Sequence, residues 1–420
     1  MQAFEHLKEL AKEHRYGGTA EERRAQEKIT RWFRELGYEV QREPTEYISS
    51  TAYLVSKWLL IFAIFILLLA SSLWINTFLV AMAFLGLFAF LYKIMPKMEL
   101  KIARTKSENI IATLNPEKEH RLILCGHYDS ARVVPKWFTR YQELRGAITP
   151  FLTLISPMGL LVVLIFHGLY YPFDLFSGFQ GTWVYVWWFF FVFTLVNYVP
   201  LLIMVFYMTD LFGSNYSLGA DDNASGIATM LEVSRRIKES RLNMRVDICC
   251  FAAEESGLFG SRGWVEKHRD EIDLERTYIL NMDMVGRGEV YFLTNGIGLI
   301  PKKRCDPALL EILKESLESN QLPYEEMWGG ATDVQEFLNR KMRAVSLMRA
   351  NSKKMNPGHK IMNFISRVPV KSNVYPDIAR WHHTEDDTTD KIHPDRLESS
   401  VDTVETFVHT LSSRIGQGPV

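Results

Sequence analysis

Two long stretches of this sequence carry almost no charge, and they limit how the rest of the chain can fold. Trp58–Tyr92 contains no charged residue, and Gly146–Thr209 contains only one aspartate and one histidine. A membrane-spanning helix needs about 20 apolar residues, so each stretch is long enough for two spans. The alternative is a set of buried core helices, but soluble cores rarely use uncharged runs of this length. The sequence therefore predicts two inserted transmembrane hairpins, at residues 53–95 and 146–209.

Positive charges beside these stretches predict their orientation in a bilayer. Lysine and arginine flank the stretches on the side of the polar remainder of the chain, at Lys57, Lys93, Lys97, Lys101, Arg104, Lys136, Arg140 and Arg145. By the positive-inside rule, that side is cytoplasmic. Residues 1–50 also lack the apolar core of a secretory signal. We expect a multi-pass protein of the inner or plasma membrane, with the lipid bilayer as a partner and the polar domain in the cytoplasm.

The remaining segments alternate between helix-like and strand-like patterns. Thr19 and Glu22 predict a capping box for a helix that runs to Arg34, with Gly37 as its stop. Further helices are predicted at 225–237, 260–268, 307–317 and 397–411. Strands are predicted at 109–114, 122–125, 245–251, 278–282, 290–293 and 344–347. This alternation predicts an α/β fold, a three-layer α/β/α domain with a mainly parallel central sheet.

The two hairpins divide this domain in the sequence. Residues 1–52, 96–145 and 210–420 are expected to form its first, second and third parts. Because the three parts must meet on one side of the bilayer, each hairpin must return the chain to the side that it left.

Charge and cysteine content narrow the function classes. The 420 residues have a net charge of −1, which gives no reason to expect a nucleic-acid partner. The four cysteines show no paired metal-binding spacing. Cys249 and Cys250 lie in an apolar run, where inert buried thiols are expected. A secreted protein held together by disulfides is therefore not expected.

Five short fragments, spread over most of the chain, contain histidine and carboxylate groups. They are His127–Ser130, Gly219–Asn223, Glu254–Glu255, Asn281–Met284 and His383–Thr388. Most stand where an apolar run gives way to a loop, which is where open α/β sheets place their chemistry. Histidine and carboxylate are ligands that suit zinc and related divalent ions. Together the fragments predict a two-metal hydrolase.

The first two fragments also have alternative interpretations. Asp129 lies two residues after His127, on the same side of an extended segment, and can hold the second ring nitrogen of that histidine. Such a pair also occurs at protein surfaces. Asp221 and Asp222 stand in a turn before a helix, and a helix-capping role suits Asp221 well.

The later fragments are harder to explain without a metal. Glu254 and Glu255 end a strand whose sequence indicates complete burial, where two unpaired charges would be costly. Asp283 ends a second apolar strand in the same way. Of His382 and His383, one is expected to be a ligand and the other to lie at the surface.

The order of these motifs resembles a known family, the co-catalytic zinc exopeptidases that include aminopeptidase Y, glutamate carboxypeptidase and glutaminyl cyclase. The resemblance covers residues 105–135 and 210–415. Residues 127–130 match the family motif His-x-Asp-Ser, and residues 219–226 match Gly-Ala-Asp-Asp-Asn-Ala-Ser-Gly. Residues 252–257 match Ala-Ala-Glu-Glu-x-Gly, and residues 383–388 match His-Thr-x-x-Asp-Thr. The last motif selects His383 over His382.

This resemblance implies two divalent metal ions, with Zn²⁺ expected. The implied metal ligands are His127, Asp222, Glu255, Asp283 and His383, and Asp222 is shared between the ions. Glu254 is the implied general base, which takes a proton from a bridging water. Asp129 is the second implied catalytic-site residue, through its hold on the first histidine.

The resemblance favours a membrane-anchored metallo-aminopeptidase that hydrolyses N-terminal residues from peptides. Residues 328–333 match the family's substrate loop only loosely, so side-chain specificity is not predicted. The nearest alternative is an acyltransferase of the glutaminyl cyclase kind, since those relatives use one zinc on similar ligand positions. A second alternative is a non-catalytic membrane protein that binds through a hydrolase-like domain, although no ligand and no base is missing. The oligomeric state is not predicted.

Overall fold

A mixed sheet forms the centre of the structure, which is a computed structural model. The structure describes residues 2–48, 104–134, 215–298, 302–329, 332–355, 360, 363–364, 367–378 and 381–418. The strands in these ranges are β1 (Glu39–Ile48), β2 (Arg104–Leu114), β3 (Arg121–His127), β4 (Arg245–Phe251), β5 (Thr277–Met282), β6 (Val290–Ile297), β7 (Lys303–Arg304), β8 (Tyr324–Trp328), β9 (Arg343–Lys354) and β10 (Val374–Asp377).

The central strands are parallel and the outer strands are largely antiparallel. The order across the sheet is β1-β2-β4-β3-β5-β9-β6-β7, with β10 beside β9 and β8 beside β6. β4, β3, β5 and β9 pair in parallel, whereas β1, β2 and β6 join the sheet by antiparallel pairing. The prediction of a mainly parallel sheet is therefore wrong for the sheet as a whole and correct for its centre.

The sequences of the central strands explain why they lie in the middle. Every residue of β5 is buried, as are all residues of β3 and β4 after the first. Parallel strands covered on both faces have continuous apolar runs of this kind, in place of the alternation of a half-exposed strand. The predicted strands at 122–125, 245–251 and 278–282 are confirmed.

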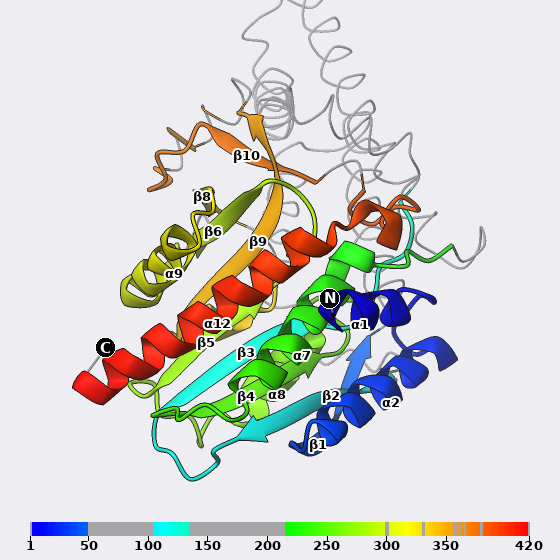
Figure 1. Cartoon of the computed structure of the whole chain (residues 1–420). Helices are drawn as coiled ribbons and strands as arrows, with labels where there is room; N and C mark the ends of the chain where they lie inside the picture. The colour runs from blue at the N-terminus through cyan, green and yellow to red at the C-terminus, as the bar shows by residue number, and fades with distance from the viewer. Residues whose placement is uncertain are drawn as a thin grey trace, which may run out of the picture.

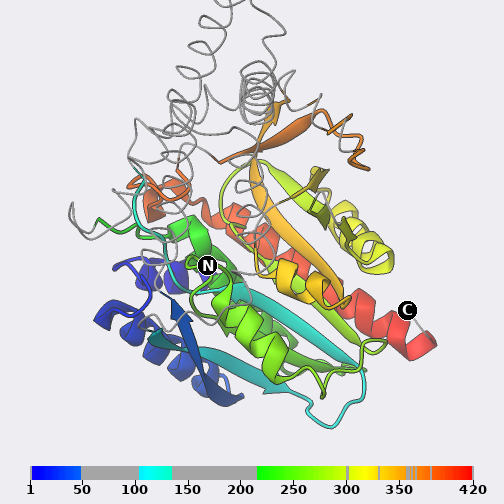
Figure 2. The ribbon, with the colours of Figure 1, turned by 180° about the vertical axis from the view of Figure 1, so that it is seen from behind.

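Helices cover both faces of the sheet. They are α1 (Gln2–Leu10), α2 (Ala20–Glu35), α7 (Gly226–Ile237), α8 (Phe259–Lys267), α9 (Pro307–Ser319), α10 (Val334–Asn339) and α12 (Pro394–Gln417), with short helical turns at Ala220–Ser225 and Thr389–Lys391. α12 packs against α7 and α9, and α1 packs against α7, on the face seen in Figure 1. α8 and α10 pack together on the opposite face, seen in Figure 2. This arrangement confirms the predicted helix–sheet–helix layering.

The start of α2 follows its predicted capping chemistry. The Thr19 hydroxyl accepts a hydrogen bond from the backbone N–H of Glu22 at 3.2 Å. The Glu22 carboxylate reaches back to the backbone N–H of Gly18 at 2.6 Å, one residue earlier than a standard capping box requires. Gly37, predicted as the stop, has a φ of +80° just after the helix.

The membrane-spanning part of the predicted fold class is wrong, and so is the predicted multi-pass membrane localisation with a cytoplasmic domain. Within the described ranges, no helix combines the length and the apolar character that crossing a bilayer requires. α12 has 24 residues, but charged side chains recur along it. The predicted hairpins at 53–95 and 146–209 themselves fall outside the described residues. The fold is corrected to a mixed α/β domain with no spanning helix among the described residues.

Candidate metal centre

The parallel centre of the sheet brings three of the predicted fragments together. β3 ends at His127, Glu254 and Glu255 follow the end of β4, and Asp283 follows the end of β5. β3 pairs in parallel with both β4 and β5, so the three strand ends lie at one edge of the sheet. Ligand sites of open α/β sheets form at this edge. Two further fragments lie outside the strands, with Asp222 in the short helical turn Ala220–Ser225 before α7 and His383 in the loop before α12.

Hydrogen bonds fix the Asp222 turn against the segment that carries Asp283. The Asn223 amide donates to the carbonyl of Met282 at 2.9 Å and accepts from the backbone N–H of Met284 at 3.2 Å. The peptide bond between Asp222 and Asn223 is cis. The two residues that flank Asp283 are therefore tied directly to the residue that follows Asp222.

A second carboxylate, Asp387, holds the same turn from the other side. Its two oxygens accept hydrogen bonds from the backbone N–H groups of Asp221 and Asp222, at 2.7 and 3.1 Å. The Asp221 side chain in turn accepts from the N–H of Gly286 at 2.9 Å. Asp221 therefore anchors the turn to the segment of Gly286. Because neither helix that begins at this turn has a side-chain cap, the helix-capping interpretation of Asp221 is wrong.

The predicted ligands meet around the Asp222 carboxylate. One oxygen, Oδ1, lies 3.2 Å from Nε2 of His127, which is also 3.6 Å from Oδ1 of Asp283. The other oxygen, Oδ2, lies 3.3 Å from Nε2 of His383, and that nitrogen is 2.9 Å from Oε2 of Glu255. Asp222 thus stands between two groups of side chains, each with one histidine and one further carboxylate.

His382 lies closer to this centre than the sequence suggested. Its Nε2 is 3.4 Å from Oδ2 of Asp222, and its ring stacks on that of His383 with centroids 3.7 Å apart. Both histidines are half-buried. Only His383 also reaches Glu255. The expectation that one of the two histidines lies free at the surface is therefore wrong.

Asp129 contacts His127 and the backbone of both glutamates that follow β4. Its carboxylate lies 3.4 Å from Nδ1 of His127, and its backbone carbonyl is closer, at 3.2 Å. Both carboxylate oxygens accept backbone hydrogen bonds, from the N–H of Glu254 at 3.1 Å and of Glu255 at 3.2 Å. Asp129 therefore positions the first histidine and the two glutamates together.

Burial and neighbouring charges shift the pKa values of the clustered groups. Burial alone would lower the pKa of His127, but the charge of Glu254 and hydrogen bonds to carboxylates raise it well above its usual range. Burial raises the pKa of Glu254 well above its usual range, and the charge of His127 acts against this. Burial also raises the pKa of Glu255, to about 7. Carboxylates crowded in this way are stabilised by positive charge placed among them.

The side chains present fit divalent metal ions. Three buried carboxylate oxygens, Oδ2 of Asp222, Oε1 of Glu255 and Oδ1 of Asp283, accept no hydrogen bond within the described residues. Buried polar atoms normally have partners, so free carboxylate oxygens that face histidine nitrogens indicate a place for a cation. Ligand atoms of His127, Asp222 and Asp283 all lie within 4.8 Å of one another, as do those of Asp222, His382 and His383.

Asp333, which sequence reasoning did not select, is a buried carboxylate of the same region. Its side chain is fully buried, at 0% exposure, just before α10. Burial raises its pKa to about 7, the charge of His127 acts against the shift, and the nearby Asp283 and Asp129 add to it. In the sequence, the one indication of a role for Asp333 is its position in residues 328–333, which match the family's substrate loop loosely.

The raised pKa of Asp333 predicts a pH-dependent stability. An unfolded aspartate ionises near pH 4, whereas folded Asp333 keeps its proton up to about pH 7. Raising the pH across this window therefore favours the unfolded chain, by roughly 4 kcal/mol at most from this group. Asp333→Asn is expected to flatten the fall in stability of the metal-free protein between pH 4.5 and 7, measured by urea unfolding at each pH. An equally steep fall in the variant would contradict the prediction.

Residues on either side of the undescribed range 135–214 lie side by side. Arg132 and Tyr216 form an antiparallel bridge. The N–H of Val133 donates to Asn215 at 2.9 Å, and the N–H of Val134 donates to His383 at 2.7 Å. The Arg132 guanidinium lies over the Tyr216 ring, 5.3 Å from its centroid. The ends of the range are thus joined next to the metal centre.

Because these ends already touch, a short connection is expected to replace most of what lies between them. A chain in which residues 147–209 are exchanged for a Gly-Ser linker of about six residues is expected to fold and to bind zinc as tightly as the full chain. Zinc affinity and thermal unfolding of the two proteins give the comparison. A folded product with strongly weakened zinc binding would show that the replaced residues contribute to the centre.

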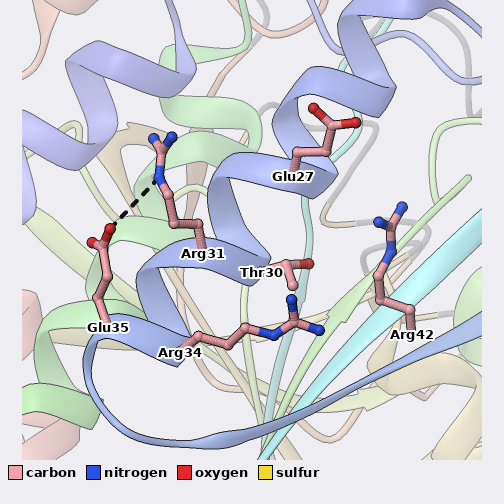
Figure 3. A pocket seen from close by; sticks show the side chains of 6 residues that line it. All are labelled: Glu27, Thr30, Arg31, Arg34, Glu35 and Arg42. Carbon is pink, nitrogen blue, oxygen red and sulfur yellow. Dashed lines mark ion pairs between the residues drawn. The ribbon is translucent and has the colours of Figure 1, made fainter.

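A surface hollow elsewhere in the described structure contains none of the predicted site residues. It lies between α2 and β1 and is lined by Glu27, Thr30, Arg31, Arg34, Glu35 and Arg42 (Figure 3). Arg31 is paired with Glu35 at 3.7 Å across a strongly exposed part of the helix. Exposed pairs of this kind contribute little to stability. Thr30 is the one buried residue of this lining, and the other five residues are charged and exposed to solvent, so the hollow is not proposed as a ligand site.

Known proteins match this chain in sequence and in fold. Residues 205–408 match the family model described as Peptidase family M28. Over 201 residues, the chain is 30% identical to aminopeptidase YwaD of Bacillus subtilis (strain 168), a match that covers 46% of this chain and 38% of that protein. The chain thus spans well under two thirds of this relative. The match supports the family resemblance that the motifs predicted.

Solved structures have a similar fold. A glutaminyl cyclase of Porphyromonas gingivalis superposes with a TM-score of 0.53 at 14% identity, covering 98% of this chain and 97% of that one. A Zn-dependent exopeptidase of Parabacteroides distasonis superposes with a TM-score of 0.52 at 13% identity, covering 97% and 96%. The fold is therefore the one shared by zinc exopeptidases and glutaminyl cyclases.

Proposed function

We propose that this chain is a metal-dependent aminopeptidase, which removes N-terminal residues from peptides. The observation that carries the proposal is the arrangement around Asp222, where two histidines and two further carboxylates meet within ion-pair distance. The match to Peptidase family M28 and the 30% identity to an aminopeptidase support a peptidase, and the latter favours action at the N-terminus.

We assign two divalent ions, Zn²⁺ by preference, to the two groups of side chains. His127, Asp222 and Asp283 would hold one ion, and Asp222, Glu255 and His383 the other. Nitrogen and carboxylate donors of this kind suit zinc. Ions bound in such a pair polarise a substrate carbonyl and lower the pKa of a water molecule.

Glu254 is the proposed general base and acid. A carboxylate oxygen of Glu254 lies within 4.8 Å of a nitrogen of His127 and an oxygen of Glu255, so it stands beside both ligand groups. Glu254 would take a proton from the water that attacks the peptide carbonyl and then give it to the leaving amine, which restores the carboxylate. Positive ions nearby would lower its raised pKa and so favour the base form.

Release of free amino acids tests this function. The purified chain with added zinc is expected to release leucine or alanine from dipeptides and to leave N-acetylated dipeptides intact. Treatment with a chelator is expected to abolish the release, and added zinc is expected to restore it. Wild-type protein that binds zinc but releases no amino acid from a panel of dipeptides would contradict the proposal.

A glutaminyl-cyclase-like activity is the second candidate, favoured by the fold shared with the Porphyromonas gingivalis enzyme. A peptide with N-terminal glutamine separates the two functions. Cyclisation releases ammonia and leaves all peptide bonds intact, whereas the aminopeptidase releases free glutamine. Ammonia release without free glutamine would favour the second candidate.

A further inference from the structure

Arg15 is a buried arginine that the matched family region, residues 205–408, does not include. Its side chain is almost completely buried, at 1% exposure, in the loop between α1 and α2. We infer that Arg15 is a positioning residue, which holds the segment of His127 and the segment of Asp222 together so that their side chains can share a metal ion. The inference rests on the metal centre of the proposed function.

The guanidinium spans the two segments through backbone carbonyls. Nε donates to the carbonyl of Tyr128 at 2.7 Å, directly after His127 in the sequence. Nη1 and Nη2 donate to the carbonyls of Leu218 and Gly219, at 2.7 and 2.8 Å, just before the Asp222 turn. A fourth bond, from Nη1 to Leu10 at 3.2 Å, ties this bridge to the end of α1.

The Arg15 backbone adds two bonds to the first segment. Its N–H donates to the Ser130 hydroxyl at 2.8 Å, and its carbonyl accepts from the Ser130 N–H at 3.4 Å. Ser130 is fully buried and follows Asp129, which orients His127. Arg15 therefore contacts the chain on both sides of Asp129.

The second segment fits closely around the guanidinium. Gly219 has a φ of +57°, and a Cβ there would lie 2.8 Å from Nη2 of Arg15 and 2.3 Å from the carbonyl oxygen of Asp222. Only glycine allows the backbone to approach this near. The turn that carries Asp222 is thus shaped to receive the arginine.

The positive charge of Arg15 interacts with carboxylates in and around the metal centre. All four side-chain hydrogen bonds go to neutral carbonyls, so the positive charge is not cancelled by a directly bonded carboxylate. The carboxylates that act on it through space are Asp387, Asp129, Asp222 and Glu255. A fixed positive charge at this place offsets part of their mutual repulsion when the metal is absent.

Arginine suits this role better than lysine. Its planar fork donates in several fixed directions, whereas a lysine ammonium is a compact point charge on a flexible stem. Arg15→Lys would keep the charge and leave some of the four carbonyls without a donor, which is costly in a buried place. The variant therefore tests positioning separately from charge.

Zinc affinity of Arg15→Lys is the test, measured by competition with a coloured chelator. Loss of an outer contact to a metal site typically weakens metal binding about 10–100-fold, and a loss in this range is expected. The visible spectrum of the Co²⁺-loaded variant is expected to shift as well, because the ligand geometry changes. The thermal unfolding midpoint of the metal-free protein is recorded in parallel.

Arg349→Lys is the matched control. Arg349 is also buried, at 4% exposure, and its side chain donates to Gly288, Tyr291, Arg396 and Ser399, between 2.6 and 2.9 Å. None of these four partners is a proposed ligand. The control is expected to lower the unfolding midpoint of the metal-free protein about as much as Arg15→Lys does, with zinc affinity within twofold of the wild type.

A second variant covers the case in which Arg15→Lys does not fold. Ser130→Ala removes one acceptor of the Arg15 backbone and is expected to weaken zinc binding about fivefold, as the loss of one hydrogen bond would. Zinc affinities and Co²⁺ spectra equal to those of the wild type in the folded variants would overturn the inference alone. A wild-type chain that binds no zinc would overturn the proposed function, and this inference with it.

Discussion

Replacing Glu254 by glutamine is expected to remove nearly all turnover while zinc binding stays close to that of the wild type. The change deletes the group that takes up and returns a proton, and it keeps the size of the side chain. General acid–base groups contribute about 10²–10⁴-fold to rate, so kcat is expected to fall in that range. KM is expected to change little, because the proposed base does not hold the substrate. Steady-state kinetics on a dipeptide and zinc content by elemental analysis give both quantities.

An exposed glutamate supplies the control for this substitution. Glu239 lies in the loop after α7 and is exposed to solvent. Glu239→Gln removes the same charge from the chain and is expected to leave kcat and zinc content unchanged. Substantial activity in Glu254→Gln would show that another group is the base, and zinc loss in that variant would show that Glu254 is a ligand.

Asp222→Ala is expected to lose both ions and all measurable activity. Asp222 lies within ion-pair distance of His127 on one side and of His383 on the other, so its removal opens both ligand groups. Asp283→Ala, in contrast, removes a neighbour of His127 only. That variant is expected to keep one ion, at Glu255 and His383. Two, one and no ions per chain are thus expected for the wild type, Asp283→Ala and Asp222→Ala.

Folding of the two aspartate variants has to be confirmed for this comparison. Circular dichroism and the thermal unfolding midpoint of each metal-free variant serve as the control. A folded Asp222→Ala protein that retains two ions would contradict the central position of this carboxylate. Equal ion loss in both variants would show that the two ligand groups do not bind independently.

The part of the centre that lies on the sheet could be predicted from the sequence, for a physical reason. Apolar runs that end in a histidine or a carboxylate identify buried strands, and the carboxyl ends of parallel strands meet at one edge. His127, Glu255 and Asp283 were placed together in this way. Asp222 and His383 lie outside the strands, so their place in the centre was predicted from the order of the motifs.

The residues around the proposed ligands, such as Arg15 and Asp387, could not be predicted from the sequence in the same way. Arg15 donates to backbone carbonyls, and carbonyls leave no signal in the sequence about which side chain binds them. Asp387 holds the Asp222 turn from 165 residues away along the chain, through backbone N–H groups alone. The family motif selects His383 over His382, whereas the structure places both rings beside Asp222.

The pairing of the outer strands was harder to predict from the sequence than the metal centre. β1 and β2 pair in an antiparallel ladder of ten residues although residues 49–103 separate them in the sequence. With the antiparallel pairing of β2 with β4 and of β6 with β9, this ladder makes the sheet mixed. Such pairing depends on contacts that local patterns do not encode. The membrane-spanning prediction rested on the length of uncharged runs alone, and no described helix meets that requirement.

The position of bound zinc tests the proposed two-metal centre most directly. A crystal of the zinc-loaded chain, measured at the zinc absorption edge, is predicted to show two anomalous peaks, one on each side of the Asp222 carboxylate. Paired sites of this kind place their ions roughly 3.5–4 Å apart, and this spacing is expected here. Peaks only at other places, or no zinc near Asp222 in a fully loaded crystal, would contradict the proposed centre.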